Sequence, residues 1–262
     1  MSTLTVSTPE LMPSARLWRA YWIETRFELV KMLRSAAFTL PFLAIPLAAY
    51  LLFGVAIAGE AIAKDPQLAD YLFSGFSVLA ISGPALFGVG CTLAHERDAG
   101  LLQLKRAQPA PAGSWLVAKM VVSVVFGALA YLPILAAGIA IGKLTVTPAE
   151  LAAMSVVLIL GVLPFSAVGL LVGTLASGSA APAWTNLIYL PMLWLSGMFI
   201  PLPAFLHGQT IIWPAFHLNQ IALAAGGVEK FKFIPPQLAV AVLMGITTVC
   251  AVFALWRLRR RG

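Results

Sequence analysis

Charged side chains are scarce in this sequence. They make up 10% of its 262 residues, while 60% of the residues are hydrophobic; a soluble domain carries roughly 25% charged residues. So few charges cannot cover the surface of a water-soluble fold of this length. The apolar residues also fall in blocks of roughly 20 or more, each long enough to cross the hydrocarbon layer as a helix. These unbroken blocks argue against a β-barrel and predict an all-α membrane protein.

Motifs for chemistry are also missing. A phosphate loop needs the pattern G-x-x-x-x-G-K-[ST]. The nearest approach is Gly138, Gly142 and Lys143, but its glycine spacing is one residue short and Leu144 stands where a hydroxyl is required. The three histidines have no cluster of cysteines or carboxylates beside them. We therefore expect no catalytic residues, no metal site and no cofactor bound by this chain.

Six apolar segments predict six spanning helices. The mixed segment 203–233 contains apolar stretches that are each too short to span, and we expect a re-entrant external hairpin there rather than an ordinary loop. The pairs Gly138/Gly142 and Gly169/Gly173 have the spacing that lets membrane helices approach closely. The predicted spans are 36–59, 70–94, 116–142, 150–177, 181–202 and 234–257.

An amphipathic helix is predicted over residues 14–34, after a polar segment, 1–13, that we expect to be flexible. At 100° per residue its tryptophans fall on one face with several aliphatic residues. Tryptophan favours the level of the lipid headgroups, so we expect this helix to lie in the membrane interface. The alternative is a cytosolic helix packed on a protein surface. The residues that characterise the helix are Trp18, Trp22, Arg26 and Leu29.

Positive charges predict the orientation. If the N-terminus is cytoplasmic, 13 of the 17 Lys and Arg residues lie on the cytoplasmic side and 4 on the other, as the positive-inside rule requires. We therefore expect both termini in the cytoplasm, with the basic tail 258–262 at anionic lipid rather than at nucleic acid. No ionisable residue lies in the middle of a predicted span, which argues against an ion-driven pump or a voltage-gated channel.

The most informative polar segment is the predicted cytoplasmic loop 95–115. It opens with charges of both signs, continues with a glycine and three leucines, and ends at two prolines. We expect a short amphipathic helix near 99–107. Exposed leucines flanked by charge indicate a protein contact; alternatively, they rest on the bundle's own inner face.

At this loop the sequence resembles the ABC-2 type permeases, the membrane subunits of bacterial ABC exporters. The amphipathic helix before the first span is similar to the elbow helix of that family. The resemblance covers nearly the whole chain in order, and the chain departs from it at 105–108, where many relatives have apolar or small residues. The matching motifs are Glu96–Leu104 followed by Gln108–Ala110 and Lys119, then Leu195–Leu202, then Trp213–Asn219.

The resemblance implies a permease subunit in the cytoplasmic (inner) membrane of a bacterium. Two six-span subunits would form one export pathway, as a homodimer, which we expect, or as a heterodimer of two permeases. Two copies of a separate cytosolic ATPase would bind ATP and Mg²⁺. The loop would be the coupling helix, seated in a cleft of that ATPase. The residues assigned to this contact are Glu96, Arg97, Asp98, Gly100, Leu101, Leu104 and Lys105.

Other functions stay open at this point. An uncharged interior favours a hydrophobic or amphipathic substrate. The alternatives are a secondary transporter or channel that needs no ATPase, a membrane-embedded lipid-modifying enzyme, and a structural assembly factor. Lipid contact or packing is the alternative for each candidate pathway residue. The candidates for a substrate pathway are Asn186, Tyr189, Trp194 and Phe199 on the fifth predicted span.

Overall fold

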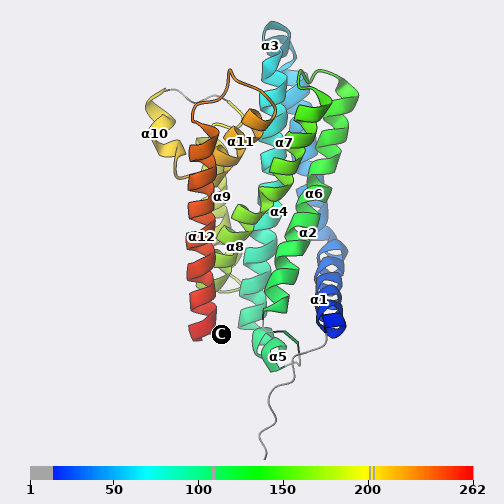
Figure 1. Ribbon diagram of the computed structural model, residues 1–262, viewed down its shortest axis with the longest axis vertical. Helices are drawn as coiled ribbons and strands as arrows, with labels where there is room; N and C mark the ends of the chain where they lie inside the picture. The colour runs from blue at the N-terminus through cyan, green and yellow to red at the C-terminus, as the bar shows by residue number, and fades with distance from the viewer. Residues whose placement is uncertain (1–13, 108–109, 112, 201, 203, 262) are drawn as a thin grey trace, which may run out of the picture.

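The computed structural model describes residues 14–107, 110–111, 113–200, 202 and 204–261, and these residues form helices and connecting turns without a β-strand. Figure 1 shows a bundle with α3 at one end and with α5 and the C-terminus at the other; we call these the upper and the lower end. The elements are α1 (Ser14–Arg34), α2 (Ala36–Ala49), the π-helical η1 (Tyr50–Ile57), α3 (Gly59–Lys64), α4 (Gln67–Asp98), α5 (Leu101–Ala107), α6 (Ser114–Ile141), α7 (Pro148–Leu160), α8 (Val162–Leu175), α9 (Ala181–Leu195), the 3₁₀-helix η2 (Ala204–Leu206), α10 (His207–Thr210), α11 (Pro214–Ala225) and α12 (Pro236–Arg261).

Five of the described helices are long and apolar enough to cross a membrane. This confirms an all-helical, multi-pass membrane protein. The predicted span 181–202 gives instead α9, whose 15 residues extend for only about 22 Å. The sixth span therefore stays a prediction. The five helical stretches are Ala36–Ile57, Gln67–Asp98, Ser114–Ile141, Pro148–Leu175 and Pro236–Arg260.

Helix α4 runs through the centre of the bundle, with α8, α6, α2, α9 and α11 packed around it. Glycines let α8 come close to it. A methyl group at Gly169 would lie 2.6 Å from the Leu86 carbonyl oxygen, and one at Gly173 would lie 2.7 Å from the Gly90 carbonyl oxygen. The predicted close approach at this pair is therefore correct. Gly142 has another role: its φ of +67° ends α6.

The turn that follows α9 is held tightly against α4 near the upper end. A methyl group at Gly75 would lie 1.9 Å from the Met198 carbonyl oxygen, and the Tyr71 hydroxyl donates a hydrogen bond to the Gly197 carbonyl. Only a glycine at position 75 allows the turn after α9 to cross α4 at this distance.

Helix α11 lies inside the upper half of the bundle, against α7, α12 and α4. Leu218 on α11 fills the space beside Gly161, where a methyl group would lie 2.3 Å from its side chain. Gly161 separates α7 from α8 and stands 13 residues from the start of α7, about 20 Å along the helix. On α4, Ser74 donates a 2.6 Å hydrogen bond to the Asn219 side chain.

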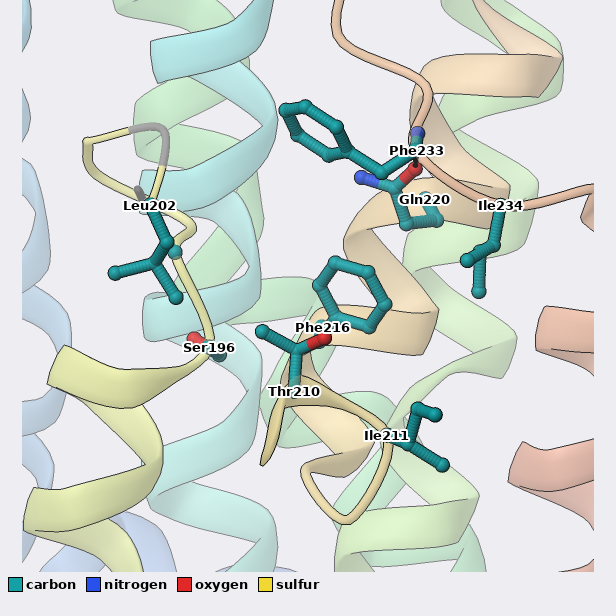
Figure 2. Close-up of a pocket in the computed structure, with 9 residues that line it drawn as sticks. Ser196, Leu202, Thr210, Ile211, Phe216, Gln220, Phe233 and Ile234 are labelled. Atoms are coloured by element: carbon teal, nitrogen blue, oxygen red, sulfur yellow. Dashed lines mark hydrogen bonds between the residues drawn. The ribbon is translucent and has the colours of Figure 1, made fainter. Parts of the chain in front are cut away.

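A small cavity of about 100 Å³ lies beside α11. Figure 2 shows that its walls come from the end of α9, the segment that leads into α11, α11 itself and the residues before α12. The Gln220 amide is held there by hydrogen bonds to the Phe231 carbonyl (3.2 Å) and from the Phe233 N–H (2.7 Å). These bonds tie the segment after α11 to α11.

Candidate functional site

The short helix α5 projects from the lower end of the bundle (Figure 1). It follows Gly100, whose φ of +71° turns the chain after α4. Leu102 is only 2% exposed and packs in an apolar cluster with Trp115 and Leu258. Leu104, by contrast, is 63% exposed, and Leu101 is 40% exposed. One leucine therefore anchors α5 while two face outward.

A cluster of charges with a buried centre lies directly beside α5. Lys119 of α6 is 4% exposed, and its Nζ lies 3.3 Å from the Glu28 carboxylate of α1 and 3.0 Å from the Glu96 carboxylate of α4. Lys31 joins the same two carboxylates, at 2.5 Å from each. Lys105 of α5 lies 3.0 Å from Glu28. The charge cluster, Glu24, Glu28, Lys31, Glu96, Lys105 and Lys119, thus connects α1, α4, α5 and α6.

The charges in this cluster balance. It holds three carboxylates and three ammonium groups. The third carboxylate, that of Glu24, lies 2.7 Å from the Lys105 ammonium. Burial alone would raise the pKa of the Glu28 carboxyl, but Lys119, Lys31 and Lys105 together lower it to about 2. Burial alone would lower the pKa of the Lys31 ammonium, but Glu28 and Glu96 raise it above 10.5. Glu28 and Lys31 are therefore ionised at physiological pH, and the formal charges of the six side chains sum to zero.

The two residues after Glu96 bind a different part of the bundle. Arg97 donates hydrogen bonds to the carbonyls of Gly173 (2.9 Å), in the last turn of α8, and of Ala176 (2.6 Å), the residue that follows α8. The Asp98 carboxylate accepts a 2.6 Å hydrogen bond from the Gly178 N–H, in the turn between α8 and α9. A cation at the carbonyl end of a helix is favourable. Consecutive side chains at the end of α4 thus fasten it to α1 and α6, to α8, and to the base of α9.

Several residues predicted to contact an ATPase instead form contacts within the chain. Glu96, Arg97 and Asp98 make polar contacts within the chain, and Glu96 is 5% exposed. Lys105 is likewise bonded to α1. Leu101 and Leu104 are the predicted contact residues that expose apolar side chains, at 40% and 63% respectively.

The elbow helix α1 divides into two parts. Trp18 (73% exposed) and Trp22 (68% exposed) face outward, and Arg26 is also exposed. Leu29 packs with Phe126 of α6 in a small apolar cluster. The first part is free to contact lipid headgroups, and the second part is joined to the bundle.

The predicted pathway residues do not gather around one cavity within the chain. Asn186 and Trp194 lie on the exposed face of α9. Tyr189 and Phe199 pack against α4 instead, with ring centroids 5.5 Å from Phe87 and 4.9 Å from Phe76, respectively.

A partly exposed strip of α4 lies between α2 and α9. Every residue of 71–91 is buried except Leu79, Phe87 and Cys91, which are half-buried. At Gly83, a methyl group would lie 2.7 Å from Phe42 of α2 and 3.0 Å from the Tyr189 hydroxyl of α9. We call Leu79, Phe87 and Cys91 the α4 strip.

A groove of about 350 Å³ begins where the α4 strip reaches the lower end. Cys91 and Phe38 form its apolar part, and Lys31, His95 and Glu96 form its polar part. Leu101 of α5 also lines it. The groove therefore joins the outward-facing side of α5, the charge cluster and the half-buried face of α4.

Sequence reasoning missed most of the charge cluster. Glu28 and Lys31 lie on the helix that was predicted to be amphipathic and interfacial, and no partner was predicted for its charged residues. A signal was present in Lys119, a single charge within an apolar stretch, since a charge in that position needs a partner. The spacing of four between Glu24 and Glu28 also places both carboxylates on one side of the helix.

The fold and this site define a multi-pass helical membrane protein with a short helix at the lower end that exposes two leucines. The chain matches the ABC-2 type transporter family over residues 19–230. It therefore belongs to the ABC-2 type transporter family, as the sequence motifs predicted. It is also 26% identical over 212 residues to the "Putative transport permease YvfS" of Bacillus subtilis (strain 168), which covers 79% of this chain and 86% of that protein. Both findings indicate a transporter permease rather than an enzyme, and permeases of this family are generally paired with an ABC ATPase.

Proposed function

We propose that the chain is the transmembrane permease subunit of an ABC exporter, driven by a separate cytosolic ATPase that binds ATP and Mg²⁺. The observation that carries this proposal is the arrangement of α5. Leu101 and Leu104 face away from the bundle, while Leu102 and Lys105 fix the helix to it. Exposed leucines on a firmly held helix are what an ATPase cleft needs to move the helix as a rigid body.

In this proposal the lower end is cytoplasmic. The chain lies in the inner membrane of a bacterium with both termini in the cytoplasm, in agreement with the distribution of Lys and Arg. Trp18 and Trp22 then stand at the headgroups of the inner leaflet, where exposed tryptophans are favourable.

We propose that α9 and the turn after it form the sixth crossing. The base of α9 lies at the lower end beside Asp98, and the turn after it reaches Gly75 in the upper half of α4. The segment 203–233 is proposed as a re-entrant hairpin that leaves and returns to the upper side. The position of Leu218 beside Gly161, about 20 Å below the start of α7, supports this.

Two copies of the chain are proposed to form the pathway between them, as a homodimer with two ATPase copies. The α4 strip supports this, because α2 and α9 leave it half-buried in a single chain. Its apolar side chains suit a hydrophobic or amphipathic substrate. Asn186 and Trp194 on the exposed face of α9 would line the same space, with Tyr189 and Phe199 behind them. Substrate would enter from the groove at the lower end.

The contacts at the end of α4 provide the route by which a movement of α5 would reach the spanning helices. The ATPase would displace α5 through Leu101 and Leu104. Glu96 would pass the displacement to Lys31 and Lys119, that is, to α1 and α6. Arg97 and Asp98 would pass it to the end of α8 and the base of α9, on the side of the α4 strip.

The test is purification of the tagged chain from native membranes in mild detergent, with identification of stoichiometric partners. We expect an ATPase with a phosphate loop, and we expect its loss in the double variant Leu101→Asp/Leu104→Asp. The control is Ala107→Asp, which adds a charge at another exposed position of α5. A chain that elutes alone, and stimulates no candidate ATPase, would instead support a secondary transporter or channel.

A further inference from the structure

A second groove at the lower end lies between α5, the start of α6 and the end of α12, and it shares no described lining residue with the groove at the α4 strip. Its volume is about 540 Å³. A volume of this size is typical of a ligand site. The side chains that shape it are Lys105, Trp115, Leu116, Leu255, Leu258 and Arg259.

We call this groove the basic groove, because Lys105 and Arg259 line it. Its floor, however, is apolar. Trp115 (7% exposed) and Leu258 (5% exposed) belong to the apolar cluster that also anchors Leu102 of α5. Leu255, at 37% exposed, forms the open side. Apolar chains placed here would extend the packing of α6 and α12.

The rim of the basic groove is positive. Its described lining residues include Lys105 and Arg259 and no carboxylate. The charge of Lys105 is already balanced by Glu24 and Glu28. Arg259, by contrast, is exposed and lies among the arginines at 257–261. No Asp or Glu follows Glu229 in the sequence. An anion at this rim is therefore favoured.

The groove also crosses the boundary between the predicted spans and the polar residues that flank them. Leu116 and Leu255 lie within the predicted spans 116–142 and 234–257, and Lys105 and Arg259 lie outside them. A ligand with apolar chains and an anionic head fits both parts at once, whereas a cytosolic protein reaches only the polar part.

We propose that the basic groove binds one anionic phospholipid of the inner leaflet, with its phosphate at Arg259 and its acyl chains against Leu116 and Leu255. Basic pockets between spanning helices on the cytoplasmic side are suited to anionic headgroups. Because the floor of the groove also holds Leu102, the lipid would stabilise the position of α5. The inference needs the lower end to be cytoplasmic, but it does not depend on the ATPase.

The experiment compares lipid retention by the purified chain in detergent, measured by native mass spectrometry with phosphatidylglycerol and phosphatidylcholine. We expect wild type to retain phosphatidylglycerol preferentially, and Arg259→Gln to reduce this retention about fivefold. The matched control is Arg260→Gln, which removes the same charge from a residue that lies over the Trp256 ring, with 4.4 Å from its Cζ to the ring centroid. Equal losses in both variants, or no loss in Arg259→Gln, would overturn the proposal.

A second pair of variants tests the acyl chains. Leu116→Trp fills the groove and should reduce phosphatidylglycerol retention, while Val117→Trp, at an exposed neighbouring position, should not. Inorganic phosphate provides the comparison without acyl chains. If phosphate displaces the lipid completely and Leu116→Trp has no effect, the groove is an anion site only and the proposal is wrong. It is also wrong if Arg259→Gln lowers ATPase co-purification but leaves lipid retention unchanged, because the groove is then a protein contact.

Discussion

Replacing Lys119 with methionine should destabilise the lower end of the bundle. Lys119 lies between two carboxylates, Glu28 and Glu96, that are each 5% exposed. Removing one partner of a buried ion pair costs about 3–5 kcal/mol, because a buried charge is left uncompensated. Lys31 still contacts both carboxylates at 2.5 Å, so we expect the lower limit, about 3 kcal/mol.

The neutrality of the cluster gives this prediction a sharper form. The Lys119→Met variant leaves a net charge of −1 in the cluster, and the double variant Glu96→Gln/Lys119→Met restores neutrality. We therefore expect the double variant to recover about half of the lost stability; together with Glu96→Gln alone it completes the double-mutant cycle that measures the coupling between the two residues.

The assay is thermal unfolding of the purified chain in detergent at pH 7. A loss of about 3 kcal/mol should lower Tm by about 6–12 °C, with partial recovery in the double variant. The reasoning is refuted if Lys119→Met leaves Tm unchanged, or if the double variant is less stable than Lys119→Met alone.

Three further predictions follow from individual contacts. The pKa of Glu28 is lowered in the fold from 4.5 to about 2, so the ionised Glu28 carboxylate stabilises the fold above pH 4.5, and this contribution is lost as the pH falls from 4.5 to 2. Tm should therefore decline over that pH interval. The decline should be smaller in Glu28→Gln. Gly75→Ala should destabilise the chain by about 2 kcal/mol or more, because the added methyl group would overlap the Met198 carbonyl oxygen. The control is Gly59→Ala, at a position with open space around it. Equal Tm values for the two variants would contradict this prediction. Gly169→Leu should separate α4 from α8 and prevent stable expression, as gel filtration would show, and a monodisperse variant with wild-type Tm would disprove it.

Hydropathy predicted five of the six proposed spanning helices in agreement with the structure, because a long apolar block needs only its own length to be recognised. It placed 116–142 within two residues of α6 (Ser114–Ile141). It ended the second span at 94, although α4 continues to Asp98. The charges of that last turn bind other helices, and such pairing over 65 to 80 residues of sequence is invisible to a local pattern.

The candidate site was predicted in its position but not in its contacts. The loop at 95–115 does form a short helix, and two of its three leucines do face outward. The direction of each side chain was not predictable, because Leu101 and Leu102 are adjacent and equally apolar. What buries Leu102 and not Leu101 is the presence of Trp115 and Leu258, which depends on the tertiary packing of α6 and α12.

The three consecutive side chains at the end of α4 also limit how the loop that carries α5 can be exchanged between permeases. Glu96, Arg97 and Asp98 each point to a different neighbour, because successive helical residues are rotated by 100°. One inserted residue before Glu96 would turn all three away from their partners together. After Gly100 this restriction ends, since the chain has already left the helix. A chimaera designed to recruit another ATPase should therefore be joined after Gly100 and should keep the Lys105 ammonium in register with α1.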